Sequence, residues 1–182
     1  FEVAVQDNGG TANGGVDKSV TESYTITVDA VNDAPTFTAV NPSAVNEDSG
    51  AQTVQNWASG FSAGPADEVD AGQTLDGYEV TILGETSPGL FLQDPAVDNA
   101  GTLTYTPGPD QFGTATISVT AKDTGGTPNG GQDTSEAQTF TITVNSVNDE
   151  PDFTASAVPL TSDEDQGQVT IPGWITVFKP DA

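Results

Sequence analysis

The residues of this chain best suited to chemistry are acidic and amide side chains, which gather in short segments rich in glycine and proline. Their oxygen atoms are the donors that Ca²⁺ prefers, because calcium accepts roughly six to eight carboxylate, carbonyl and water oxygens in flexible geometry. Magnesium demands stricter octahedral geometry, and zinc favours His or Cys, neither of which occurs in the sequence. The pattern therefore predicts structural calcium, with the candidate ligands Asn32, Asp33, Glu47, Asp48, Asp67, Glu68, Asp70, Asp123, Asn148 and Asp149.

A glycine-rich loop at 123–134 begins with one of these candidates. Its sequence DTGGTPNGGQDT has a copy at 7–18, DNGGTANGGVDK, so carboxylates stand near both ends of each loop. The paired glycines and the Asn-Gly step allow positive φ angles and a tight turn, which gives the loop a purely structural explanation. Aspartate is also common in solvated turns. An ion ligand and a solvated turn residue are therefore both open interpretations of Asp123 and of Asp133.

The charge of the chain excludes several classes of function. It has 27 Asp and Glu against 3 Lys and Arg, and its net charge is −24. Nucleic acids and anionic membranes need basic side chains to neutralise phosphates, so neither is an expected partner. The sequence also shows no apolar run long enough to insert into a membrane. Targeting signals would lie outside this stretch of sequence.

Enzymatic chemistry has little support in the sequence. Without His or Cys, neither a Ser-His-Asp triad nor a Cys-His pair can form. A pair of carboxylates of the glycosidase type remains formally open, but the acidic candidates lie on loops at the expected ends of a domain. We expect a protein that is not an enzyme.

The chain is built from a repeat. Residues 1–39 return at 117–155 without a gap, and more than half of the aligned positions are identical. The segment NEDSGAQTVQNW at 46–57 likewise returns as DEDQGQVTIPGW at 163–174. A period of about 116 residues is the size of a whole domain rather than of a short solenoid unit. We expect the C-terminal part of one repeat at 1–34, a complete repeat at 35–150 and the N-terminal part of a third at 151–182.

Alternation of apolar and polar residues dominates the complete repeat. In 113–122, Ala115, Ile117 and Val119 alternate with Thr and Ser, which is typical of a half-buried antiparallel strand. No window of useful length shows helical spacing. The expected strands are 36–41, 51–57, 77–83, 90–93, 102–106, 113–122 and 136–146. Seven short strands separated by turn residues predict an all-β fold, an antiparallel Greek-key β-sandwich.

This topology predicts which acidic clusters meet. Strand 36–41 runs away from the entry linker VNDAP, so the loop 42–50 lies at the far end of the domain, and the return strand brings the loop 60–76 back. The group expected at the near end is Asn32, Asp33, Asp67, Glu68, Asp70 and Asp123. The group expected at the far end is Glu47, Asp48, Asn148, Asp149 and, as a possible further member, Asp110. Carboxylates gathered at both junctions would repel one another without a cation.

The chain resembles the bacterial cadherin-like, or Ig-like, tandem repeats of large secreted and surface adhesins of the RTX type. The matching segments are DNGGTANGGVD, TITVDAVNDAPTF, NEDSG, GTLTYTPGPDQFGTATISVTAKDTGG and VNDEP. The resemblance implies calcium at the domain junctions. It assigns ligand roles to Glu47, to Asp67, Glu68 and Asp70, to Asn32 and Asp33, and to Asp123. The linker VNDAP has fewer acidic residues than the linker of animal cadherins, and Asp110 matches the family pattern only loosely.

We therefore expect a calcium-stiffened extender repeat of a long extracellular or cell-surface bacterial protein, whose partners are its neighbouring repeats. One alternative is a subunit that self-associates into a filament. Another is an adhesive or carbohydrate-binding module, for which Trp57, Tyr78 or Tyr105 would have to be exposed. Burial of these aromatics in the core is the competing interpretation.

Overall fold

The computed structural model describes residues 1–155 and 161–179. The chain divides into two compact units, Phe1–Val31 (unit 1) and Asn32–Ala182 (unit 2). The described part is mostly β-strand with almost no helix, so the all-β class predicted from the sequence is confirmed.

Unit 1 is a hairpin. Strand β1 (Glu2–Val3) pairs antiparallel with β2 (Glu22–Ser23), and a further bridge joins Gln6 to Lys18. Between them lies a loop with the short 3-10 helix η1 (Ala12–Gly14). The large apolar side chains of this unit are exposed, and they include Phe1, Tyr24, Ile26 and Val28.

Unit 2 contains one four-stranded sheet in the order β4-β11-β10-β7. Strand β10 is antiparallel to both of its neighbours, whereas β4 runs parallel to β11. The long strands alternate apolar and Thr or Ser residues, which favours a pleated, half-buried conformation. The strands are β4 (Val45–Asn46), β7 (Leu75–Glu85), β10 (Gly113–Asp123) and β11 (Gln138–Asn145).

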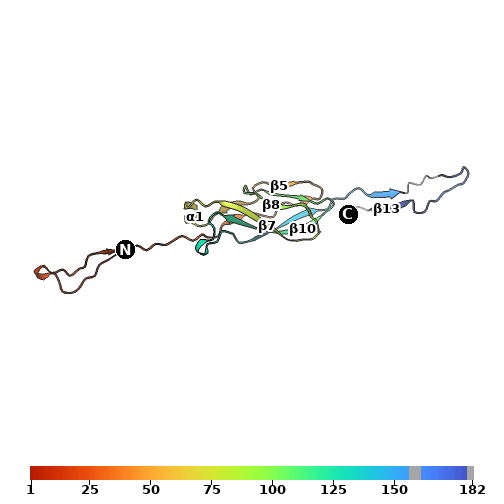
Figure 1. Cartoon of the computed structure of the whole chain (residues 1–182). Coiled ribbons are helices and arrows are strands. Elements are labelled where there is room, and N and C mark those ends of the chain that lie inside the picture. The colour runs from red at the N-terminus through yellow and green to blue at the C-terminus, as the bar shows by residue number, and fades with distance from the viewer. Residues whose placement is uncertain (156–160, 180–182) are drawn as a thin grey trace. The chain divides into compact units, whose positions relative to one another are not determined.

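Shorter antiparallel sheets complete unit 2. One has the order β5-β9-β8, a second pairs β3 with β6, and a third pairs β12 with β13. Within unit 2, Figure 1 shows β5 and β8 on one side of the strand-rich body and β7 and β10 on the other, with α1 at one end of this body. The bounds are β3 (Thr36–Thr38), β5 (Gln52–Val54), β6 (Ser59–Ser62), α1 (Ala66–Asp70), β8 (Phe91–Val97), β9 (Leu103–Pro107), β12 (Asp152–Ala155) and β13 (Ile175–Lys179).

The core lies between the four-stranded sheet and the β5-β9-β8 sheet, because side chains of both form one buried cluster. Every second residue of β10 from Ala115 to Ala121 is buried, as the alternation in the sequence predicts. The largest fully buried apolar side chains are Tyr105, Leu90, Leu103, Ile117, Ile142 and Val119. Burial of this apolar surface contributes about 25 cal/mol per Å² to folding.

The observed elements differ from the predicted ones mainly at short segments. Each of the seven predicted ranges overlaps a strand, and residues 35–150 hold two further short strands, β4 and β6. The segment PADEVDAGQ, expected as a loop, contains the helix α1. Pro65 precedes its first turn, and Asp67 and Glu68 lie within that turn, where acidic side chains interact favourably with the helix dipole. Five residues are too few for a periodic signal to be visible in the sequence.

The aromatic side chains considered for ligand binding are largely internal. Trp57 is buried, donates its indole N–H to the Val40 carbonyl at 2.8 Å and lies edge-on to Phe140 at 4.8 Å between ring centroids. Tyr105 is 1% exposed and contacts Phe91 edge-on at 5.7 Å. Neither Trp57 nor Tyr105 therefore presents a face to a ligand.

Tyr105 carries a buried hydroxyl with no hydrogen-bond partner among the described residues. Burial also raises its pKa above the ordinary value of 10.0. Because the pKa of Tyr105 is higher in the folded than in the unfolded state, its contribution to the free energy of unfolding is fully present below pH 10.0. This contribution is lost as the pH rises through the folded-state pKa.

We predict that Tyr105→Phe leaves the free energy of unfolding unchanged or raises it by up to about 1 kcal/mol, because it removes an unsatisfied polar atom and keeps the ring. Chemical denaturation at pH 7 measures this effect. The variant should also lose less stability than the parent between pH 9 and 11, about one pH unit either side of the tyrosine pKa. A loss of more than about 1 kcal/mol at pH 7 would show that the hydroxyl has a favourable partner.

Candidate functional site

The loop after β10 is shaped by its own backbone. Asp123 N donates to Asp133 O at 2.9 Å, which closes the base, and Gly131 N donates to Pro128 O at 3.0 Å, which caps the 3-10 helix η2 (Pro128–Gly130). Asn129 stands at φ 57°, a left-handed conformation that asparagine tolerates better than most residues. The Asn-Gly step in the sequence therefore has the structural role that its turn chemistry predicts.

Asn32 from the linker VNDAP is clamped inside this loop. Its Nδ2 donates to three acceptors, Asp123 Oδ1 at 3.1 Å, Gly126 O at 3.1 Å and Gln132 O at 2.7 Å. The backbone carbonyl of Asn32 accepts a hydrogen bond from Gln132 N at 2.8 Å. Because all three partners of the amide group are acceptors, the NH₂ end must face the loop, and the orientation of the amide is fixed.

The next linker residue is held by a buried glutamate. Glu68 of α1 is 2% exposed, and its Oε1 accepts the backbone N–H of Asp33 at 3.0 Å. Gly64 makes room for this carboxylate, since a Cβ at Gly64 would stand 2.8 Å from Glu68 Oε2. Pro35 follows as a buried residue, so Asn32, Asp33 and Pro35 of the linker are each held within unit 2.

Four side-chain oxygens around the linker are buried and have no hydrogen-bond donor among the described residues: Asn32 Oδ1, Glu68 Oε2, Gln73 Oε1 and Asp123 Oδ2. Two of them meet at Gly125, where a Cβ would collide with both Asn32 Oδ1 and Gln73 Oε1. Gly125 N in turn donates to Asp123 Oδ1 at 2.8 Å. Buried oxygens without donors are costly unless positive charge or a donor is supplied.

The electrostatics of this near-linker site, defined as Asn32, Glu68, Gln73 and Asp123, are negative. Asp123 is 1% exposed and Glu68 2%, and the described ion pair nearest to them joins Lys122 to Asp133 at 3.6 Å on the outside of the loop. The donor set consists of carboxylate and amide oxygens, which suits a hard cation.

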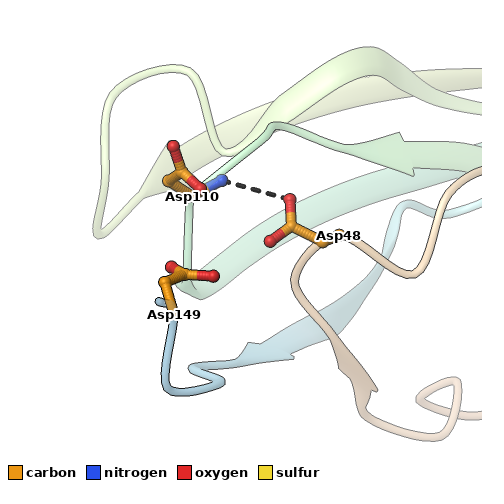
Figure 2. Close-up of side chains that lie close together, drawn as sticks. All are labelled: Asp48, Asp110 and Asp149. Atoms are coloured by element: carbon orange, nitrogen blue, oxygen red, sulfur yellow. Dashed lines mark hydrogen bonds between the residues drawn. The ribbon is translucent and has the colours of Figure 1, made fainter. Parts of the chain in front are cut away.

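A second acidic cluster lies where the complete repeat ends. Asp48, Asp110 and Asp149 each place one carboxylate oxygen within 4.8 Å of the others, and together they could hold a metal ion. Figure 2 shows the three side chains converging from separate loops, with Asp110 N donating to Asp48 Oδ1 at 3.3 Å. Asp48 and Asp110 both have positive φ, 58° and 53°.

Glu47 binds the outgoing linker VNDEP beside this cluster. It is 2% exposed, and its Oε1 accepts Val147 N at 2.6 Å while its Oε2 is buried without a donor among the described residues. Glu47 thus holds the linker VNDEP as Glu68 holds VNDAP, each through one backbone N–H.

The structure brings together some of the predicted residues and separates others. Asn32 contacts Asp123, Asp33 contacts Glu68, and Asp48 and Asp149 meet with Asp110. Asp67 and Asp70 are exposed on α1, and Asn148 is exposed and donates to the carbonyl of its neighbour at 3.1 Å. Gln73 and Gly125 were not predicted from the sequence, since a neutral amide and a turn glycine carry no ligand signal by themselves.

No protein-family model, curated protein or solved structure matches the chain. The described part of the chain also contains no helix with the length and apolar character that a membrane span requires.

We predict that Asn32→Ala lowers the free energy of unfolding of unit 2 by about 2 kcal/mol, because the loop loses its side-chain donor and keeps buried acceptors. The matched control is Asn148→Ala, which removes the same side chain from the exposed copy of the linker and should cost less than about 0.5 kcal/mol. Chemical denaturation of both variants checks the pair. Equal effects would contradict the clamp.

Proposed function

We propose that the chain is a structural calcium-binding extender repeat, in which Ca²⁺ bound beside each linker stiffens a tandem array. The observation that carries this proposal is the set of buried oxygens without donors in the near-linker site. A cation there would be contacted from the linker by Asn32, from the α1 segment by Glu68 and Gln73, and from the loop by Asp123. It would thereby join three segments that are distant in sequence.

Calcium fits this site better than other common metals. Amide and carboxylate oxygens from flexible segments suit its large and irregular coordination shell. The chain contains no His or Cys for zinc. The far-linker cluster of Asp48, Asp110 and Asp149 offers a second place for an ion, next to the linker VNDEP.

We propose a Greek-key β-sandwich for the complete repeat at 35–150, flanked by parts of neighbouring repeats at 1–34 and 151–182. The sheet orders β4-β11-β10-β7 and β5-β9-β8, together with one shared core, support this topology. Residues of unit 1 that correspond to buried positions of the repeat are exposed, as Ile26 and Val28 illustrate beside Ile142 and Val144. Such residues need the rest of a repeat to cover them.

The proposed role is mechanical rather than enzymatic, in an extracellular or cell-surface bacterial protein whose nearest partners are its own repeats. The resemblance to cadherin-like repeats supports this setting. The strongly acidic surface supports it too, because like charge keeps a long array soluble and disfavours edge-to-edge pairing. Two of the three aromatics considered for carbohydrate binding, Trp57 and Tyr105, are buried, and the third, Tyr78, is half-buried and packs edge-on to Phe37.

Calcium titration tests the near-linker site. At free calcium about 100-fold above the dissociation constant, binding to the folded state alone would raise stability by about 2.7 kcal/mol. Asp123→Asn should abolish most of this gain, and Gly125→Ala should do so without changing any charge, because its methyl group fills the space between the Asn32 and Gln73 oxygens. The control Asp94→Asn removes one exposed carboxylate of β8 and should keep the full gain.

A rival arrangement makes the opposite prediction. If Oε1 and Nε2 of the Gln73 amide exchange places, Nε2 donates to Asn32 Oδ1. The buried oxygen of Asn32 and the amide of Gln73 would then be satisfied without an ion. Stability would then be indifferent to calcium, and Gln73→Ala would lower it in EGTA as much as in calcium. Such a result would overturn the near-linker site.

The stiffening itself is tested by small-angle scattering of the whole chain in calcium and in EGTA. We predict a greater maximum dimension and a narrower distance distribution in calcium, because ions beside the linkers restrict their torsion angles. The variant Gly125→Ala should weaken this response. Unchanged scattering together with an intact calcium-dependent rise in stability would place the ion in a local, non-mechanical role.

A further inference from the structure

The first and last segments of the complete repeat lie side by side and run in the same direction. Strand β4 is parallel to β11, with Val45 opposite Val144 and Asn46 opposite Asn145. Glu47 N continues this pairing by donating to Asn145 O at 2.9 Å. The backbone pairing is short, so by itself it joins the two segments over only a few residues.

Side chains prolong the parallel alignment toward the start of β11. Gln138 Nε2 donates to Phe37 O at 3.0 Å, and Thr141 N donates to Asn41 Oδ1 at 2.9 Å. In both contacts a side-chain amide takes the place of a backbone partner that the neighbouring segment does not supply. The edge of β11 is therefore bonded to the first segment well before β4 begins.

One register runs through all of these contacts. Beyond β4, Val147 N donates to Glu47 Oε1 at 2.6 Å. The partners of the side-chain bonds are separated by 101 residues at Gln138, 100 at Thr141 and 100 at Val147. We call this set of contacts between segments 37–47 and 138–147 the parallel interface.

The first segment also belongs to the core of the repeat. Phe37 is part of the buried cluster, and Val45 packs against it. Between them, Val40 O accepts the indole N–H of Trp57 at 2.8 Å. Release of segment 37–47 from β11 would therefore open the core to water, so it is a step that precedes unfolding of the whole body.

The direction of the strands decides how tension acts on the parallel interface. Asn32 lies in the loop that follows β10, and β11 is antiparallel to β10, so β11 begins at the end where the chain enters. The chain leaves at the other end, after Val147. Tension along the chain pulls segment 37–47 toward the entry end and segment 138–147 toward the exit end. Because these opposite pulls lie along the strands, they shear the interface and load all of its hydrogen bonds together.

We propose that the complete repeat is a tension-bearing unit, and that the parallel interface sets the force at which it unfolds. Forced unfolding is governed by the rate of unfolding rather than by equilibrium stability, and contacts broken before the barrier determine that rate. The proposal rests on the proposed tandem array only for the source of the tension. The contacts of the interface are hydrogen bonds, so the resistance is present without calcium.

The experiment stretches the whole chain by its two ends in EGTA, using single-molecule force spectroscopy. The sequence has no Cys, so cysteines added at the ends are unique attachment points. Unfolding of residues 35–150 is recognised by a gain in contour length of about 3.5 Å per residue. At equal force, Asn41→Ala and Gln138→Ala should each unfold roughly threefold to tenfold faster than the parent, because each removes one hydrogen bond of the interface.

Asn99→Ala is the matched control for Asn41→Ala. Both asparagines are exposed, and Asn99 Nδ2 donates to Asp76 O at 3.1 Å, outside the parallel interface. Chemical denaturation should show similar small losses of equilibrium stability for the two variants, whereas only Asn41→Ala accelerates forced unfolding. Equal acceleration by Asn99→Ala, or unfolding of both Asn41→Ala and Gln138→Ala at the rate of the parent, would overturn the proposal.

The direction of pulling supplies a second test that leaves the interface unaltered. Ala137 is exposed and directly precedes β11, so Ala137→Cys provides an attachment point at the entry end. Force between residue 137 and the N-terminus separates the two segments from one end and breaks their contacts one after another. Unfolding should then occur at lower force than in end-to-end stretching. Equal forces in the two geometries would refute the parallel interface as the source of resistance, whatever the outcome of the calcium titration.

Discussion

The described structure depends on how buried carboxylates are satisfied in a chain that has 27 acidic residues and only 3 basic ones. Glu47, Glu68 and Asp123 are each almost fully buried, and each uses one oxygen to accept a backbone N–H. The other oxygen of each has no donor among the described residues. The two glutamates thereby hold the incoming and outgoing linkers, and the spare oxygens concentrate negative potential beside them. This is the arrangement that a divalent cation neutralises most effectively.

The hydrogen bonds at the linker and the apolar core have different roles in the repeat. The core is formed by alternate residues of β10 and β11 against β8 and β9, and its burial is non-directional, so it stabilises the body without fixing the chain that enters it. Asn32 fixes that chain through hydrogen bonds of defined direction to the loop 123–132. Substitutions at the linkers should accordingly change the orientation and stiffness of the chain more than they change the core.

The glycine-rich loops show how much of this arrangement is local. The loop 7–17 has the backbone structure of the loop 123–133 although its own hairpin, unit 1, has exposed apolar side chains and only two short paired strands. Positive φ angles at Asn13, Gly10 and Gly14 are available to these residue types at little cost, so the loop forms without tertiary support. A preformed loop loses little conformational entropy when it accepts a linker asparagine.

The sequence by itself determined the repeat, the all-β class, the buried face of β10 and the turn-forming role of the Asn-Gly loops, because these follow from periods and residue preferences that act over a few residues. It also named Asn32, Asp33, Glu68 and Asp123 for the near end. Only the tertiary structure decided that Asn32 enters the loop, that Glu68 rather than Asp67 or Asp70 turns inward from α1, and that Gln73 and Gly125 lie beside Asn32. Those outcomes depend on the directions of single side chains, which are set by packing between segments distant in sequence.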